Sequence, residues 1–332
     1  MRPYLYLRGL KKLVRESRGD ETVHVGIRPY GFHAGNTMAL IVYPYLFCKY
    51  LEDAGKEPRL KFIISLNDWE QDALDGPNYR KFPFNIYPKT TSLQFTPDEF
   101  GCCESVAAHW GKIIKQRLAF LKKRFPNISI RFVKNSELIK FPFCKKLLME
   151  TIKHPEKQAD IYRKYSHMPV LSSPIKYAGV ICYRCKSAHG KTEVVGKSSI
   201  RWKCDKCGAS KEGSFKKFNY WWYHKPMLIA RIKIFKVQIT LSGGDHFNEG
   251  DFKIREIFIR KYAPGIREPK MMFTPTLIAL NGVKMSKSRD NAAFAHTRKL
   301  IEIMDDYKKG EFQITKELIK SRLDEKDYSN IF

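Results

Sequence analysis

The chain has 332 residues, of which 43% are hydrophobic and 13% aromatic, so it can bury a large core and is not an intrinsically disordered protein. A formal net charge of +27 predicts an anionic partner, with nucleic acid favoured over a membrane surface. A lysine-rich surface that serves only solubility is the alternative. The longest apolar run, residues 38–48, is too short to cross a bilayer, which takes about 20 residues.

The basic N-terminus lacks the apolar core of a secretory signal. We therefore expect a cytoplasmic protein whose eight cysteines are thiols or metal ligands and form no disulfides. Cys48, Cys102, Cys103 and Cys144 have no metal-ligand spacing and are predicted to be ordinary buried thiols.

Alternating strand-like and helix-like segments predict an α/β fold with a parallel, Rossmann-like sheet. The expected strands are 22–27, 61–66, 128–133, 237–241 and 273–280, and the expected helices are 1–20, 37–54, 98–124, 136–153, 155–166, 219–236 and 249–262. The predicted organisation is a basic N-terminal helix (1–20), the first half of a Rossmann-like domain (21–135), an insertion (136–218), the second half of that domain (219–291) and a short helical C-terminal segment (292–332).

A phosphate-binding turn is predicted directly after the first strand of the parallel sheet. His33, Gly35 and Asn36 lie between that strand and the following helix. The N-terminus of a helix attracts phosphate through its free N–H groups and its dipole. Gly35 allows a ligand to approach the backbone closely, while His33 and Asn36 offer hydrogen bonds to phosphate oxygens. Capping of the helix by the histidine is the structural alternative.

Within the insertion, residues 179–213 predict a zinc ribbon. Cys182 and Cys185 form one Cys-x-x-Cys turn, and Cys204 and Cys207 form a second, with eighteen residues between the two. Each turn can direct two thiolates at one ion, and Gly208 follows the second where a tight turn is needed. A site with four thiolates has no open position, so the expected Zn²⁺ is structural.

Two segments near the C-terminal end complete a predicted nucleotide site. Gly243, Gly244, Asp245 and His246 follow a strand, where a parallel sheet can present a carboxylate to a ribose. The loop 282–291 follows the last strand and carries the lysines and hydroxyls that a mobile triphosphate-binding loop would use. Its predicted ligand-binding residues are Lys284, Met285, Ser286, Lys287 and Ser288.

Taken together, residues 33–36, 243–246 and 284–288 resemble the motifs of class I aminoacyl-tRNA synthetases. The chain is most similar to class I lysyl-tRNA synthetases, because residues 96–105 resemble their Pro-Asp-Pro-Phe-Gly segment and the paired zinc knuckles also fit. The resemblance covers roughly residues 22 to 307. The chain ends about 44 residues after the lysine loop, so we expect it to lack the family's C-terminal anticodon-binding domain.

The resemblance implies activation of an amino acid by ATP and Mg²⁺, followed by transfer to tRNA, with lysine as the favoured amino acid. His33, Asn36, Lys284 and Lys287 would be catalytic. A lysine ammonium needs a carboxylate or an aromatic face. The expected amino-acid pocket contains Gly26, Tyr30, Asp68, Trp69, Glu70 and Arg231.

Several alternatives remain open at this stage. The chain could act on another amino acid or a non-tRNA acceptor, or could be a catalytically silent RNA-binding paralogue. A tryptophanyl or tyrosyl type of synthetase has a similar compact length, but the zinc ribbon favours the lysyl type. A separate subunit could supply anticodon recognition.

Overall fold

A computed structural model describes residues 3–31, 33–70, 91–165, 178–196, 198–222, 224–248, 250–285 and 293–320. At its centre is a six-stranded sheet in which paired strands are all parallel, in the order β1-β11-β10-β2-β3-β4. Its strands are β1 (Pro3–Leu5), β2 (Thr22–Ile27), β3 (Lys61–Leu66), β4 (Ser129–Lys134), β10 (Ile239–Ser242) and β11 (Lys270–Phe273). The predicted Rossmann-like parallel sheet is confirmed.

The order of the strands locates the expected ligand site. From β2 the chain adds β3 and β4 on one side, and it later adds β10 and β11 on the other side. The strand order therefore reverses between β2 and β10, where Val25 pairs with Leu241. Ligands of open α/β sheets bind outside the carboxyl ends of the strands at such a point. The residues after Ile27 and Ser242 are thus placed to form a site.

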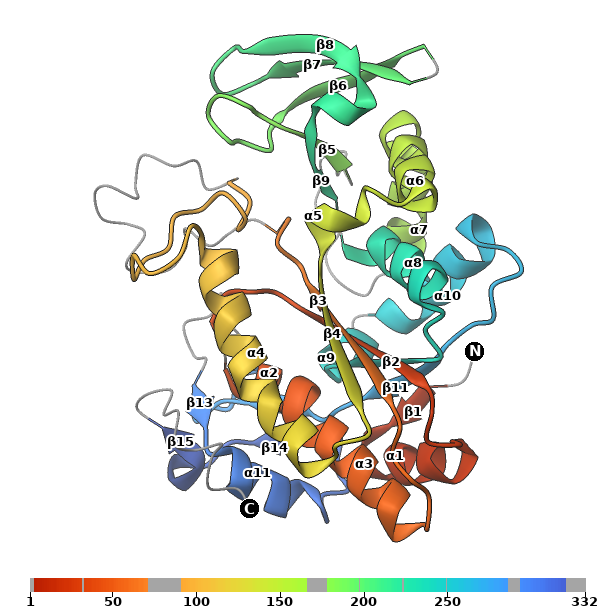
Figure 1. Ribbon diagram of the computed structural model, residues 1–332, viewed down its shortest axis with the longest axis vertical. Coiled ribbons are helices and arrows are strands. Elements are labelled where there is room, and N and C mark those ends of the chain that lie inside the picture. Colours follow the sequence, from red (N-terminus) through yellow and green to blue (C-terminus); the bar gives the residue numbers. More distant parts are fainter. Residues whose placement is uncertain are drawn as a thin grey trace.

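Helices cover both faces of the sheet because its strands are apolar on both faces. Along β3, Phe62, Ile64 and Leu66 pack into one core and Ile63 packs into the other. The first core includes α1 (Tyr6–Glu16), α2 (Ala34–Thr37), η1 (Met38–Val42), α3 (Tyr43–Asp53), α4 (Val106–Arg124) and α11 (Thr297–Met304). The second includes α6 (Pro142–Lys153), α7 (Pro155–Tyr165), α8 (His224–Phe235) and α10 (Asp251–Tyr262), across the strands from α3 and α4 (Figure 1).

Between α7 and α8 the chain builds a separate antiparallel unit, seen at the top of Figure 1. There β5 (Ala178–Ile181) pairs with β9 (Asn219–Trp222), and β6 (Gly190–Val195), β7 (Ser199–Cys204) and β8 (Ser210–Ser214) form a three-stranded sheet. The remaining short elements are α5 (Asn135–Leu138), η5 (Phe215–Lys217), α9 (Asp245–Asn248), β12 (Thr276–Ile278), β13 (Phe294–Ala295), β14 (Glu311–Gln313), η7 (Lys316–Leu318) and β15 (Ile319–Lys320). Across the described ranges, no helix has the length and apolarity needed to cross a membrane.

Two predicted helices begin later than expected. The N-terminal helix begins at Tyr6, because the preceding residues form β1 along one edge of the sheet, where Pro3 needs no hydrogen-bond partner for a backbone N–H. The helix expected from Asp98 begins at Val106, after Ser105 caps it by accepting a hydrogen bond from the Ala108 N–H. The Asp98 carboxylate instead bonds to backbone N–H groups of a non-helical loop.

Three further predicted elements are divided. The helix expected over 136–153 forms as α5 and α6, with residues 139–141 between them. The helix expected over 219–236 starts as strand β9, where aromatic residues such as Tyr220 suit a pleated surface, and becomes helix α8 afterwards. The strand expected over 273–280 is interrupted at Pro275, which has no N–H for a sheet ladder. The sheet strand β11 ends at Phe273, and β12 pairs with β14 outside the central sheet.

Candidate functional site

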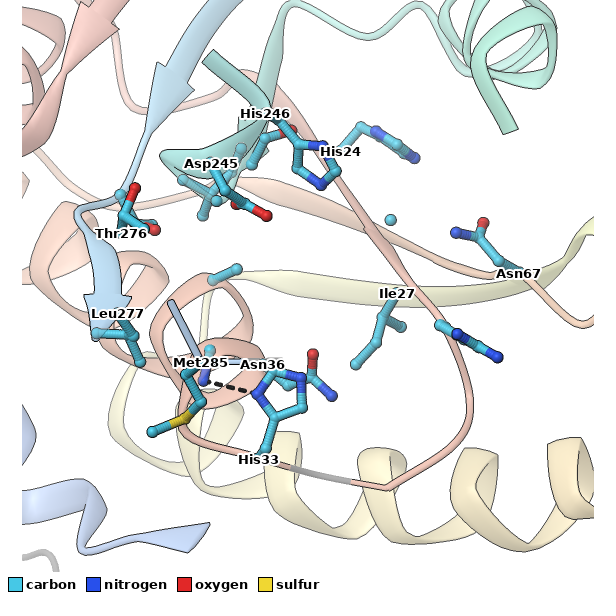
Figure 2. A pocket seen from close by; sticks show the side chains of 18 of the residues that line it. His24, Ile27, His33, Asn36, Asn67, Asp245, His246, Thr276, Leu277 and Met285 are labelled. Atoms are coloured by element: carbon cyan, nitrogen blue, oxygen red, sulfur yellow. Dashed lines mark hydrogen bonds between the residues drawn. The ribbon is translucent and has the colours of Figure 1, made fainter. Parts of the chain in front are cut away.

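A cavity of about 330 Å³ lies at the carboxyl ends of β2 and β10. Residues from separate parts of the chain meet there, and Figure 2 shows His33 and Asn36 on one side of it, with Asp245 and His246 on another. The sequence-predicted residues that line it are Gly26, His33, Gly35, Asn36, Glu70, Arg231, Gly243, Asp245, His246, Lys284 and Met285. Ser286, Lys287 and Ser288 lie outside the described residues.

The turn after β2 holds His33 in a capping role. Its Nδ1 accepts a hydrogen bond of 3.0 Å from the Gly35 N–H, at the start of α2. A Cβ on Gly35 would lie 2.8 Å from Cε1 of His33, so a larger residue would displace the imidazole. Asn36 donates from Nδ2 to the Gly31 carbonyl oxygen at 3.0 Å. The capping alternative for His33 is thus realised, and the ring still lines the cavity.

The turn after β10 packs closely against the segment after β11. A Cβ on Gly244 would lie 2.3 Å from the Thr274 carbonyl oxygen, so only glycine allows this approach. Although Gly244 is not among the cavity-lining residues, it lets the two strand ends converge. The next residue, Asp245, reaches the cavity, and its Oδ2 lies 2.9 Å from Nζ of Lys284. Burial would raise the pKa of Asp245, but His246 and Lys284 together hold it below its ordinary value.

Lys284 is positioned by a tight turn that follows β12. Gly282 has a φ of +74°, in the left-handed region, and donates its N–H to the Ala279 carbonyl oxygen. Lys284 then forms an antiparallel bridge with Ile278, and the Met285 N–H donates to Leu277 at 2.8 Å. The backbone thereby presents the first lysine of the loop to the cavity.

Only some of the predicted amino-acid pocket lies at the cavity. Asp68 is buried away from it, where both carboxylate oxygens accept hydrogen bonds from Ser136. Trp69 packs in the second core, and Tyr30 packs against the first core beside Arg28. These three side chains therefore serve packing and hydrogen bonding and are not among the residues that line the cavity.

Glu70 does line the cavity. Its Oε2 lies 3.6 Å from Nε of Arg28, another lining residue. Both side chains are partly exposed, so this ion pair contributes little to stability and can rearrange when a ligand binds. Glu70 is therefore the member of the predicted acidic pair that a ligand in the cavity could contact.

Several residues that line the cavity were not predicted as site residues from the sequence. His24 on β2 lies 2.6 Å, through Nε2, from Oγ of Ser65. Burial, with Arg231 and Arg255 nearby, lowers the pKa of His24 well below its ordinary value, so its imidazole is neutral. Asn67 directly follows β3 and bonds to Arg231. Asn67 could have been predicted as a site residue, because it is a polar residue at the carboxyl end of a parallel strand.

The four ribbon cysteines have the geometry that a zinc ion requires. Their sulfurs all lie within 4.8 Å of one another, with Cys182 to Cys207 at 3.7 Å and Cys185 to Cys204 at 3.6 Å. Tetrahedral zinc with Zn–S bonds of about 2.3 Å separates its sulfur ligands by about 3.8 Å. Gly208 has a φ of +69°, as the predicted turn needs. The donor set therefore fits one structural Zn²⁺.

A second group of metal-ligating side chains precedes α4. Ligand atoms of Asp98, Cys102, Cys103 and His109 lie within 4.8 Å of one another, with Cys102 Sγ 3.2 Å from His109 Nδ1. The interpretation of Cys102 and Cys103 as buried thiols is wrong, because Cys102 is exposed and Cys103 half-buried. Adjacent cysteines gave no knuckle spacing, so their convergence with Asp98 could not be seen in the sequence. This set could also hold zinc.

A parallel sheet with helices on both faces and a cavity at its switch point defines a Rossmann-like α/β protein. A family model described as tRNA synthetases class I (K) matches residues 8–307. The chain therefore belongs to this family of class I aminoacyl-tRNA synthetases. The comparison with curated proteins found no match.

Solved structures of synthetases are also similar to the chain. A tyrosyl-tRNA synthetase from Archaeoglobus fulgidus is 16% identical, with a TM-score of 0.42, over 86% of this chain and 64% of that one. A tyrosyl-tRNA synthetase from Aeropyrum pernix is 18% identical, with a TM-score of 0.42, over 91% and 66%. An arginyl-tRNA synthetase from Plasmodium falciparum is 12% identical, with a TM-score of 0.32, over 83% and 46%. The chain thus spans less than two thirds of these proteins.

Proposed function

We propose that the protein activates an amino acid with ATP and transfers it to tRNA. The observation that carries this proposal is the convergence of His33, Asp245 and Lys284 on one cavity at the sheet's switch point. In the reaction, a carboxylate oxygen of the amino acid attacks the α-phosphorus of ATP, a P–O bond forms, and pyrophosphate leaves with the electrons of the bond that breaks. This chemistry requires positioning and charge stabilisation, and no covalent nucleophile from the protein.

Each lining segment has a role in the proposed reaction. His33, Asn36 and the N–H groups after Gly35 would bind phosphate oxygens, and Asp245 would accept hydrogen bonds from the ribose hydroxyls. Lys284 would stabilise negative charge on the leaving pyrophosphate. Of the remaining predicted residues, Gly243, Gly244, His246 and Met285 would shape the nucleotide site, and Ser286, Lys287 and Ser288 would complete the lysine loop. Mg²⁺ would neutralise phosphate charge in the bound nucleotide.

Lysine is the amino acid that we propose, in keeping with the family described for K. Glu70 supports it, because this carboxylate lines the cavity, where it lies 3.6 Å from Arg28. A lysine ammonium could replace the arginine as the partner of Glu70. For the acceptor, the net charge of +27 favours tRNA, since cationic surface binds phosphate with a steep dependence on salt.

The first experiment measures ATP–pyrophosphate exchange with each standard amino acid. Exchange with lysine is expected, and exchange with another amino acid would replace lysine in the proposal. The His33→Ala variant should lose activity, whereas His154→Ala should keep it, because the half-buried His154 lies between α6 and α7 and does not line the cavity. Silence of the wild-type protein with every amino acid would contradict the activity and favour a non-catalytic RNA-binding role.

A second experiment addresses the side-chain pocket and the acceptor. Glu70→Gln should raise KM for lysine by about 10-fold while the KM for ATP stays the same, because a charge-assisted contact is lost. Glu57→Gln, at an exposed glutamate, is the matched control. Charging of tRNA would identify the acceptor. Formation of the adenylate without any charging of tRNA would point to a small molecule, a carrier or a protein side chain as the acceptor.

A further inference from the structure

Arg231 is a buried guanidinium whose hydrogen-bond partners are all neutral. It lies on α8 with a residue exposure of 3% and lines the cavity. Its Nη2 donates to Oδ1 of Asn67 at 2.7 Å and to Oδ1 of Asn135 at 2.6 Å. Within the described ranges, its Nε has no hydrogen-bond partner and no carboxylate forms an ion pair with it. A buried charge in this state is costly unless an anion compensates it.

Arg255 lines the same cavity and, within the described residues, has a carboxylate partner that Arg231 lacks. Arg255 is also buried, but its Nη2 lies 3.1 Å from Asp251 and its Nη1 donates to Ser242 at 2.8 Å. Burial lowers the pKa of both guanidinium groups to about 10, so both remain charged at neutral pH. The protein therefore supplies a carboxylate to one of these two arginines and leaves the other with amides alone.

The space beside Arg231 suits a small anionic group. A Cβ on Gly26 would lie 3.4 Å from Nη1 of Arg231 and 3.6 Å from Cε1 of His24, so the glycine keeps this face open. His24 is neutral and does not add a second charge. The nearest acids act only at longer range, since Glu70 is paired with Arg28 and Asp68 with Ser136.

The position of Arg231 separates it from the proposed phosphate-binding residues. Its partner Asn67 lies at the opposite side of the cavity from Thr276 and Leu277, the residues that lead into the lysine turn (Figure 2). A nucleotide held by His33, Asp245 and Lys284 would leave the end near Arg231 to the amino acid. Carboxylates are the anions that amino acids carry, and a guanidinium binds them through a planar fork.

We propose that Arg231 binds a carboxylate of the amino-acid substrate. This inference rests on the proposed function and names the contact that orients the substrate. The carboxylate can come from two sources: the α-carboxylate, which every amino acid has, or the side chain of an acidic amino acid. In either case Asn67 and Asn135 hold the guanidinium in place, and the incoming carboxylate supplies the missing negative charge.

Calorimetric titration of the full chain with each standard amino acid tests the inference without requiring turnover. For the amino acid that binds, Arg231→Gln should weaken the affinity by roughly 10- to 100-fold, because a charge-assisted hydrogen bond is lost. The affinity for ATP should stay within about twofold, which also shows that the variant is folded. Equal amino-acid affinity in variant and wild type overturns the inference, as does a loss of affinity for ATP alone.

If Arg231→Gln loses all binding, Arg231→Lys decides the question, because it keeps a positive charge on this side chain. A loss of amino-acid affinity of about 5- to 10-fold is expected, since lysine donates from a single point and lacks the fork. An unchanged affinity in this variant overturns the inference. Arg163→Gln, on the exposed face of α7, is the control and should bind like the wild type.

The amino alcohol of the bound amino acid distinguishes the two sources. If wild type and Arg231→Gln bind the alcohol equally, the contacted group is the α-carboxylate. If the variant also weakens the alcohol and the amino acid is acidic, the group is the side-chain carboxylate; for any other amino acid this result overturns the inference. Failure of every amino acid to bind the wild type overturns the proposed function as well, whereas unaltered binding by the variants overturns the inference alone.

Discussion

The ammonium group of Lys284 lies 2.9 Å from the carboxylate of Asp245, so the turn after β12 is tied to the turn after β10. Both residues line the cavity, and each has a different proposed partner in a bound nucleotide. The ion pair therefore joins the two turns across the cavity. Binding of ATP would transfer Lys284 from the carboxylate to a phosphate, and Asp245 to the ribose.

Replacement of Lys284 by methionine is expected to impair the chemical step more than substrate binding. The variant keeps an unbranched side chain of similar length but removes the charge that would stabilise the leaving pyrophosphate. Loss of one such group typically costs about 100-fold in kcat. Pyrophosphate exchange should show this loss with KM values changed by less than about threefold. Lys299→Met, at an exposed position of α11, should have no effect, and full activity of Lys284→Met would refute the role.

A second prediction concerns the pH dependence of stability at Asp68. Burial raises the pKa of this carboxyl to about 6, although hydrogen bonds from Ser136 partly oppose the shift. Because the folded pKa exceeds the unfolded value of 3.8, the stabilising contribution is complete below the unfolded pKa and is lost as the pH rises towards 6. The contribution of Asp68 to the free energy of unfolding should therefore be roughly 3 kcal/mol smaller above pH 6 than below pH 3.8.

Asp68→Asn removes this titration and can keep the contacts with Ser136. Urea unfolding at about pH 4.5 and about pH 7.5 should show the variant gaining stability relative to the wild type as the pH rises. The exposed Asp160→Asn is the matched control, and its difference from the wild type should not follow this trend. A gap between Asp68→Asn and wild type that does not change with pH would contradict the raised pKa.

Much of the sheet could be predicted because each of these strands is encoded by a short, local pattern of apolar residues. Residues 22–27 and 61–66 are apolar runs bounded by charged or turn residues, and they form β2 and β3 at those positions. The motif after β2 could also be predicted, because a proline, two glycines and a histidine lie between the expected strand and the expected helix. These features depend on neighbours in the sequence, and the structure retains them.

The parts that could not be predicted depend on distant residues. Pro3 forms a strand only because Met271 lies beside it in β11. Arg231 owes its position to Asn67 and Asn135, which are 164 and 96 residues away in the chain. Asp68 was expected in the pocket because it follows a strand, but its partner Ser136 follows the neighbouring strand and draws the side chain away. No local pattern reports such pairings.

Zinc in the ribbon should be essential for the stability of that unit. Its three-stranded sheet is small, so four Zn–S bonds would supply much of its folding free energy. Cys204→Ser should lower the zinc content by one ion per chain and expose the ribbon to proteolysis. Cys144→Ser, at a buried thiol in the second core, should keep the ion. Retention of all zinc by Cys204→Ser would contradict a zinc site made of the four ribbon cysteines.

The cluster before α4 makes a separate prediction about metal content. Asp98, Cys102, Cys103 and His109 bring together two thiols, an imidazole and a carboxylate, a donor set that suits zinc. The Asp98 carboxylate accepts N–H bonds of 2.9 Å from Cys102 and from Cys103, and these bonds shape the loop. The ion is therefore expected to bind without a large change of backbone, and more weakly than the ribbon ion, because Cys102 is exposed.

Elemental analysis of the wild type should find two zinc ions per chain, one for each cluster of ligands. His109→Ala and Cys102→Ser should each remove one ion, the one that a mild chelator extracts first, while the ribbon ion remains. Cys204→Ser should show the opposite pattern, so each variant is the control for the other. His154→Ala controls for the loss of a histidine elsewhere. If the wild type contains a single zinc ion and Cys102→Ser retains it, the cluster before α4 does not bind zinc.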